Sequence, residues 1–329
     1  MRNFYALVYN EFEKLYFRRR LHVVFLLLLI LIPLFVYAQY KQNETVQKRL
    51  GSDDWRLQTT QLIADNENRL AASRLPEEWR KWLVMRNEQL RTYLALDVNP
   101  NAPGAPSFVK AFMEQGMTLF IPLFVMIVSI DLLSGEKSEG TLRALLLQPV
   151  GRSQVFLAKG VTLCLSVPVI LLLVAGLAYL ISGLVFGYRG WTLPLVTGFS
   201  VRGETLDTSR VYLIPQWRYV LELYGLGWYV STVVGWISFF IASLVRGSSA
   251  AMGTVFSFLL AGEILTNYAS SFREAKYIFS TNLDLSVYLS GLMPPIEGLT
   301  PSFALINLGI WGLLACIGSY LLFTRSDVI

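Results

Sequence analysis

A short charged stretch at residues 131–159 is the part of this chain best suited to meet another molecule. It lies between two long apolar runs, at 108–133 and 155–186. Because charged groups are expensive inside a lipid bilayer, we expect the stretch to lie in water beside a membrane. Its candidate contact residues are charged, small or apolar: Gly135, Glu136, Lys137, Glu139, Gly140, Thr141, Leu142 and Arg143.

The same stretch is predicted to contain a short surface helix. Ser138 can accept a hydrogen bond from a free backbone N–H at the start of the helix, and Pro149 ends it. Leu142, Leu145 and Leu146 share one face because of their i, i+3, i+4 spacing. This face could meet a partner protein, or it could enter the lipid headgroups as part of an ordinary cytoplasmic loop.

The run GEKSEGTL at residues 135–142 resembles the GE-x-x-x-GT-L signature of the ABC type-2 transporter permease family. In that family the signature lies in the cytoplasmic loop after the second membrane helix and includes contacts to a partner ATPase. Pro149, Arg152 and Lys159 also resemble the way the family continues towards its third span. The resemblance implies that the candidate contact residues couple the membrane subunit to an ATPase.

The resemblance further implies the membrane subunit of an ATP-driven exporter in the plasma membrane. Two copies of this chain, or this chain and a homologous permease, would form the pathway above two separate ABC ATPase subunits. ATP and Mg would bind to those partner subunits, and no cofactor would bind to this chain. Because the sequence contains no GxxxxGK[ST] phosphate loop, we expect no catalytic residue in it and no enzyme activity of its own.

The composition is that of a membrane protein. Of the 329 residues 54% are hydrophobic and only 16% are charged, whereas soluble domains keep roughly a quarter of their residues charged. The basic residues are scattered, so nucleic acid is not an expected partner, whereas membrane lipid is. One histidine and two cysteines leave little material for a metal site or a disulfide framework.

We predict an all-α membrane protein with six transmembrane helices and both termini in the cytoplasm. The basic cluster Arg18-Arg19-Arg20 directly before the first apolar run indicates this orientation. Residues 41–107 are polar with helical periodicity and predict a helical extracytoplasmic subdomain. The spans are expected at 21–40, 108–133, 155–186, 216–245, 247–268 and 302–323, with a cytoplasmic coupling loop at 134–154, an outer loop at 187–215, an outer re-entrant-like segment at 269–300 and a cytoplasmic tail at 324–329.

Residues 1–20 are predicted to form an amphipathic helix in the membrane interface. Glu11, Glu13 and Lys14 are its polar residues. Its apolar residues repeat at helical spacing: Phe4, Leu7, Val8, Phe12, Leu15 and Tyr16.

The presence of three polar residues within the predicted spans needs an explanation, because the burial of polar side chains in lipid is costly. Glu263 and Asn267 lie one turn apart in the fifth span. Glu263 could contact substrate, bind a proton or cation, or bridge to another helix, and the alternatives are a structural hydrogen bond or a place near the outer interface. Asp131 is predicted to face the headgroups beside the coupling loop, or else to position that loop.

Among exporters, the apolar spans and the outer subdomain favour an amphipathic cargo such as a peptide antibiotic, a lipid or a hydrophobic drug. Two alternatives stay open. One is a permease that exports sodium or another cation through Glu263, and the other is a non-transporting membrane sensor in which residues 41–107 bind a ligand. An ion-coupled secondary transporter would show inverted repeats or broken helices in matched positions, and the sequence displays no such pattern.

Overall fold

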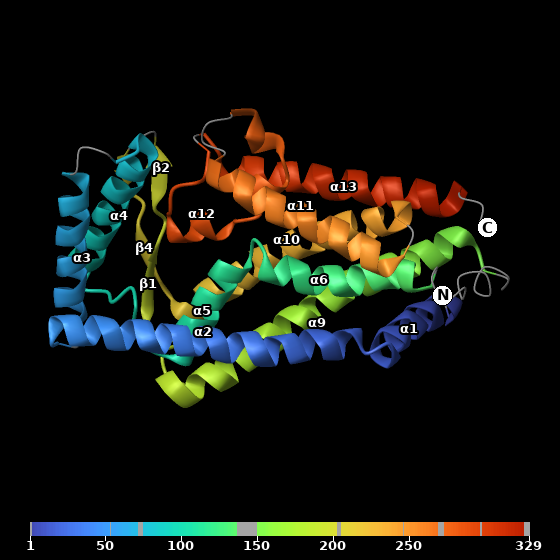
Figure 1. Cartoon of the computed structure of the whole chain (residues 1–329), viewed down its shortest axis with the longest axis horizontal. Helices are drawn as coiled ribbons and strands as arrows, with labels where there is room; N and C mark the ends of the chain where they lie inside the picture. The colour runs from blue at the N-terminus through green and yellow to red at the C-terminus, as the bar shows by residue number, and fades with distance from the viewer. Residues whose placement is uncertain are drawn as a thin grey trace.

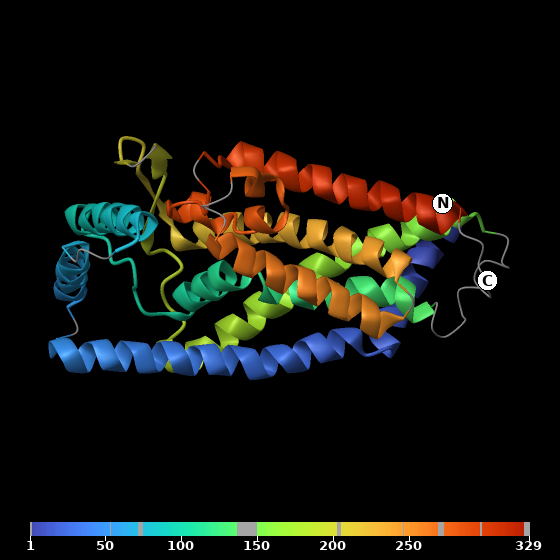
Figure 2. The same ribbon diagram turned by 45° about the horizontal axis from the view of Figure 1, so that its top comes forward.

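The chain is mainly helical, and most of its long helices lie lengthwise beside one another (Figures 1 and 2). The two marked chain ends lie at one end of the molecule, and helices α3 and α4 lie at the other. The computed structural model describes residues 2–52, 54–71, 75–136, 150–202, 205–245, 247–268, 273–296 and 298–325.

Five helices in the described part of the chain are long and apolar enough to cross a membrane. In the first of them only 22% of the most apolar stretch is buried within the protein, so most of its side chains are left for lipid. The coarse prediction of a mainly helical membrane protein is therefore confirmed. The five are α2 (Arg20–Leu50), α9 (Arg152–Phe186), α10 (Gln216–Leu244), α11 (Ser248–Tyr268) and α13 (Pro301–Arg325).

The predicted span at 108–133 is not one straight helix. It consists of α5 (Ala105–Gly116) and α6 (Phe120–Ile130), which are bent by 68° at the break between them. Pro122 explains the position of the break, because its ring clashes with the carbonyl of the residue four positions earlier and so stops a helix from running through. Counted as one broken span, the pair raises the total to six.

Helix α10 is the centre of the bundle and packs against α5, α6, α9, α11 and α13. Its closest approach to α6 lies at Gly235, whose carbonyl accepts a hydrogen bond from the Ser129 hydroxyl. A Cβ added at Gly235 would lie only 3.2 Å from Cγ1 of Val125. A residue without a side chain lets these two helices come together, as small residues commonly do between membrane helices.

The segment after the first span contains the predicted helices, but it begins later than expected. Helix α2 continues past residue 40 and ends where Gly51 takes up a left-handed conformation, at φ 63°. It is followed by α3 (Trp55–Leu70) and α4 (Glu77–Ala95). A buried hydrogen bond from Asn66 Nδ2 to Asn87 Oδ1, 2.8 Å long, joins α3 and α4.

The segment predicted as a loop at 187–215 contains short strands, which the prediction did not include. Two small antiparallel pairs form, β1 with β4 and β2 with β3. Valine and threonine recur through this segment, and such β-branched residues favour extended backbone. The strands are β1 (Pro194–Thr197), β2 (Ser200–Arg202), β3 (Thr205–Asp207) and β4 (Tyr212–Pro215).

The segment before the last span contains short helices, as its apolar pattern predicts. These are η3 (Arg273–Tyr277), η4 (Ser280–Asn282) and α12 (Ser286–Ser290). Asn307 of α13 donates hydrogen bonds to the carbonyls of Lys276 and Tyr277, 3.3 and 3.2 Å long. These bonds fasten the segment to the helix bundle.

Candidate functional site

Helix α1 (Arg2–Phe17) turns two of its charged residues, Glu11 and Lys14, towards the protein. Glu11 is only 3% exposed, whereas Tyr5 and Phe17 are 74% and 70% exposed. Of the polar residues predicted for this amphipathic helix, Glu11 is therefore buried, whereas Glu13 is exposed. Glu11 is buried because it pairs with Lys159 of α9, against which α1 packs, and with Lys14 of its own helix.

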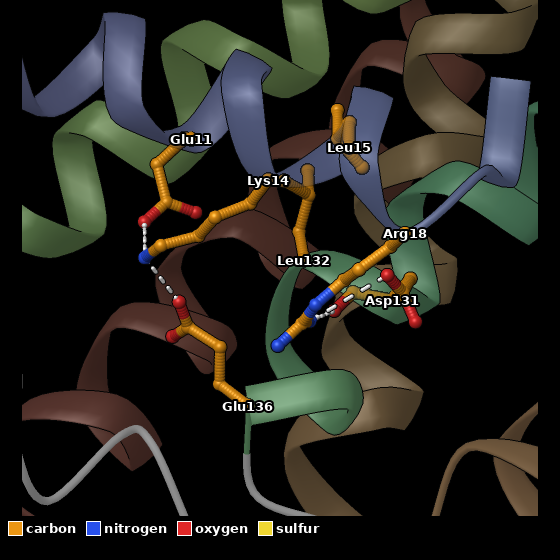
Figure 3. Close-up of a pocket in the computed structure, with 7 residues that line it drawn as sticks. All are labelled: Glu11, Lys14, Leu15, Arg18, Asp131, Leu132 and Glu136. Carbon is orange, nitrogen blue, oxygen red and sulfur yellow. Dashed lines mark hydrogen bonds and ion pairs between the residues drawn. The ribbon is translucent and has the colours of Figure 1, made fainter. Parts of the chain in front are cut away.

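Two carboxylates and two ammonium groups form a closed ring between α1, α9 and the start of the predicted coupling loop. Figure 3 shows the half of the ring made by Glu11, Lys14 and Glu136. Lys14 Nζ lies 2.8 Å from Glu11 Oε1 and 2.6 Å from Glu136 Oε1. Lys159 Nζ lies 2.7 Å from the other oxygen of each carboxylate. Glu11, Lys14, Glu136 and Lys159 are called the ion-pair ring below.

The ion-pair ring is almost completely shielded from solvent. Lys159 is 0% exposed and Glu136 is 1% exposed. Lys159 also donates a hydrogen bond of 2.8 Å to the carbonyl of Leu132. Each charge therefore has two partners of opposite sign, which is the arrangement that makes buried charge tolerable.

The pKa shifts of Glu136 and Lys14 favour their charged forms. Burial disfavours the charged form of Glu136, but Lys159 and Lys14 outweigh this and lower its pKa below the ordinary 4.5. Burial likewise opposes the charge on Lys14, but Glu11 and Glu136 outweigh it and raise its pKa above the ordinary 10.5. Both shifts favour the charged forms, so Lys14 and Glu136 are ionised at neutral pH.

A π-helical turn, η1 (Asp131–Gly135), places the acidic residues of this region. A π-helix bonds residue i to residue i+5, so it has more residues per turn than an α-helix. Asp131 and Glu136 are five positions apart. Glu136 pairs with Lys14 of α1, whereas Asp131 pairs with Arg18 and Arg20, which follow that helix (Figure 3). Single π turns inside α-helices are frequent at functional sites.

Asp131 forms a second set of ion pairs beside the ring. Its Oδ1 lies 2.8 Å from Arg20 Nη2, and its Oδ2 lies 3.6 Å from Arg18 Nη1. The Arg18 guanidinium lies over Gly135, where an added Cβ would collide with it. Asp131 is only 1% exposed, so the prediction that it faces the headgroups is wrong.

The structure brings together only some of the predicted site residues. Gly135, Glu136 and Asp131 lie around η1. Glu263 and Asn267 lie on α11, and Glu263 is half-buried there. The remaining candidates fall outside the described residues: Lys137, Glu139, Gly140, Thr141, Leu142 and Arg143.

Glu136 is held within its own chain. A side chain that is 1% exposed and bound to Lys14 and Lys159 has no surface to offer to another protein in this conformation. A contact between Glu136 and a partner ATPase stays a prediction. Gly135 likewise makes room for Arg18 of its own chain.

The sequence reading missed three members of these clusters. Glu11 interrupts an apolar stripe that runs through Leu7 and Leu15, four residues to either side, which was a visible sign of an inward-facing charge. Lys159 lies near the start of an apolar run, and only the resemblance to the permease family drew attention to it. Lys14 could be paired locally only with Glu11, three residues earlier, because its other partner, Glu136, is 122 residues away.

A protein-family model described as "Protein of unknown function (DUF2705)" matches residues 81–329. The chain belongs to this DUF2705 family. The matched region includes Asp131, Glu136 and Lys159, whereas α1 precedes it.

Two proteins of Bacillus subtilis (strain 168) are similar to this DUF2705 chain. YhcI, described as an uncharacterized protein, is 25% identical over 291 residues, which cover 79% of this chain and 88% of YhcI. YdbK, described as an uncharacterized membrane protein, is 26% identical over 214 residues, which cover 64% of this chain and 79% of YdbK. Together with the apolar helices, the description of YdbK indicates a multi-pass membrane protein.

Breaking the ion-pair ring is expected to lower the free energy of unfolding, and the losses caused by two substitutions in the ring should not be additive. Lys159→Met leaves two buried carboxylates with one cation, so we expect a loss of about 3–5 kcal/mol in the free energy of unfolding. Adding Glu136→Gln removes the surplus negative charge, so the double variant should lose less than the sum of the two single variants by roughly 1 kcal/mol or more. Equilibrium unfolding in mixed detergent micelles measures both values.

Glu13→Gln is the matched control, because Glu13 is an exposed carboxylate on α1 outside the ring. This substitution should change the free energy of unfolding little. Strictly additive costs, or a Lys159→Met variant as stable as the control, would show that the ring does not act as one unit.

Proposed function

We propose that this chain is the transmembrane permease subunit of an ATP-driven ABC exporter that moves an amphipathic cargo across the plasma membrane. The observation that carries this proposal is the position of the ion-pair ring. Glu136 is both a member of the ring and part of the run that resembles the coupling signature. The ring therefore fastens α1 and α9 to the start of the predicted coupling loop.

In this mechanism the loop receives a push from the ATPase, and the ring passes it on. Two ABC ATPase subunits would contact the loop through Lys137, Glu139, Gly140, Thr141, Leu142 and Arg143. Displacement of the loop would pull on Glu136, and through Lys14 and Lys159 it would move α1 and α9 together. Rigid movement of packed helices is one of the known routes by which a local event changes a whole domain.

The basic residues beside the ion-pair ring indicate how the chain is oriented across the membrane. Arg18 and Arg20 lie beside the ring at the end where both termini are found, and basic residues favour the cytoplasmic side. We therefore propose that both termini and the ring are cytoplasmic. Helices α3 and α4 at the other end would be outside the cell, where an exported cargo leaves.

Labelling of single cysteines tests this orientation. In a background in which Cys164 and Cys316 are replaced by serine, we expect Glu67→Cys on α3 to react with a membrane-impermeant maleimide in intact cells. Glu13→Cys on α1 should react only after the membrane is opened. Both side chains are exposed, so access to the reagent depends on sidedness alone. The reverse pattern would contradict a cytoplasmic ring.

Purification of the full chain in mild detergent from its own host tests the partnership with an ATPase. We expect the wild type to bring down a Mg-dependent ATPase whose sequence contains a GxxxxGK[ST] phosphate loop. Arg143→Glu in the loop should lose that partner, whereas the exposed Glu13→Gln should keep it. Glu136→Gln should retain part of the partner, because Glu136 is bound to Lys14 and Lys159 within its own chain and positions the loop.

If a folded wild-type chain repeatedly brings down no such ATPase, ATP-driven export is wrong. Transport that then depends on an ion gradient would indicate a secondary transporter. Ligand binding without transport would indicate a membrane sensor.

A further inference from the structure

The turn between α1 and α2 presents an exposed cation at the start of a helix that faces lipid. Arg19 lies in this turn, at the end of the molecule that contains the ion-pair ring (Figure 1). The apolar run of α2 begins two residues later, and its successive turns expose large side chains such as Leu26, at 58%, and Ile30, at 68%. A cation directly before a lipid-facing stretch lies at the level of the lipid head groups.

The two arginines that flank Arg19 are occupied within the protein. Arg20 lies 2.8 Å from Asp131, and Arg18 points towards the same carboxylate (Figure 3). Arg19 itself is exposed, and no carboxylate among the described residues forms an ion pair with it. The nearest acid in sequence, Glu13, is also exposed. The guanidinium of Arg19 is therefore available to a ligand from outside the chain.

The backbone of Arg19 has a left-handed conformation, with φ 58° and ψ 18°. Backbone hydrogen bonds fix the turn on both sides, because the Arg19 N–H donates to the carbonyl of Tyr16 and the Arg19 carbonyl accepts from the Val23 N–H, both at 3.0 Å. Glycine adopts this conformation without the strain that a Cβ brings. A residue that keeps its side chain at such a position is a candidate for a functional role of that side chain.

Aromatic rings surround this turn on both sides in sequence. Tyr16 and Phe17, at the end of α1, are 60% and 70% exposed, and their ring centroids lie 5.8 Å apart. The ring of His22, which is exposed near the start of α2, lies 5.2 Å from that of Tyr16. The three rings join the end of α1 to the lipid-facing surface of α2. Amphipathic aromatic side chains are enriched at this level of a membrane.

We propose that Tyr16, Phe17, Arg19 and His22 bind the head group of an anionic phospholipid in the leaflet around this end of the chain. The planar guanidinium of Arg19 offers a phosphate two parallel N–H donors. The single free cation selects a lipid with net negative charge over a zwitterionic one. The apolar surface of α2 continues from this site and receives the acyl chains. Binding here requires no ATPase, so it can be tested whether or not the chain is an exporter.

Native mass spectrometry of the full chain in detergent tests this preference for charge. The probes are dioleoyl phosphatidylglycerol and dioleoyl phosphatidylcholine in equal amounts, which share their acyl chains and differ in net charge. We expect the wild type to retain the anionic lipid about fivefold or more over the zwitterionic one, the effect of one arginine beside an anionic surface. Arg19→Gln should lower this preference about fivefold, whereas Arg69→Gln, at an exposed position of α3, should keep it.

Three outcomes of this experiment would overturn the proposal: no preference in the wild type, a preference that survives Arg19→Gln, or an equal loss in Arg69→Gln. The last would show a general effect of positive charge on the chain.

The environment of the aromatic rings distinguishes lipid from a partner protein. In a background in which Cys164 and Cys316 are replaced by serine, a spin label at Phe17→Cys is placed in nanodiscs that contain both lipids. We expect this label to collide more with oxygen, which concentrates in lipid, than with a water-soluble nickel chelate. A label at Glu67→Cys on α3, also exposed, should show the opposite. A Phe17→Cys label that behaves like Glu67→Cys would leave the surface open to a protein and overturn the proposal.

The stability of the chain without anionic lipid gives an independent measurement. Because glycine relieves the strain of a left-handed backbone, we expect Arg19→Gly to leave the melting temperature in phosphatidylcholine nanodiscs unchanged or higher. A clear decrease would show that Arg19 serves the fold, and it would also overturn the proposal.

Discussion

The ion-pair ring is the constraint around which the end of the molecule that contains α1 is built. It joins three segments that are far apart in sequence, and it joins them in a place that excludes water. Well-packed apolar side chains would often be as stabilising as a buried ring of this kind. Its value therefore lies in specificity, because only one placement of α1 satisfies all four charges together. The four charges must either all be paired or all be released. Such an arrangement suits a helix, here α1, that moves between two discrete positions.

The ring also explains features that look unrelated. Helix α1 exposes Tyr5 and Phe17 because its charged side is already occupied by partners within the protein. The π turn at η1 sets Glu136 towards Lys14 of α1 and Asp131 towards Arg18 and Arg20 just after it, and Gly135 leaves space for Arg18.

Much of the fold could be predicted from the sequence, because long apolar runs and helical periodicity are local signals. Five apolar helices, the helices α3 and α4, and the short helices before α13 were all visible in this way. The break before Pro122 could also have been found, since a proline inside a predicted span is a local signal. The strands at 194–215 were harder to see, because they are only three or four residues long.

The site was harder to predict, and the reason is physical. Glu136 looks like a surface residue in a charged loop, and only its contacts with Lys14 and Lys159 reveal that it is buried. Such pairing depends on how α1 packs against α9, which no local pattern encodes. Glu11 was the exception, since a charge within an apolar stripe can be recognised from spacing alone. Residues 137–143 remain a prediction from resemblance.

The most direct measurement of the ring's role is the distance between α1 and α9 in the membrane. Spin labels at Glu13→Cys and Leu157→Cys, both exposed positions, report this distance by pulsed electron resonance in a chain whose two native cysteines are replaced. We expect one narrow distribution in the wild-type background and in Arg218→Met, which removes an exposed pair with Glu222. In Lys159→Met the distribution should broaden and shift to longer distances as α1 detaches. An unchanged narrow distribution in Lys159→Met would show that packing alone holds α1, and it would contradict the central role of the ring.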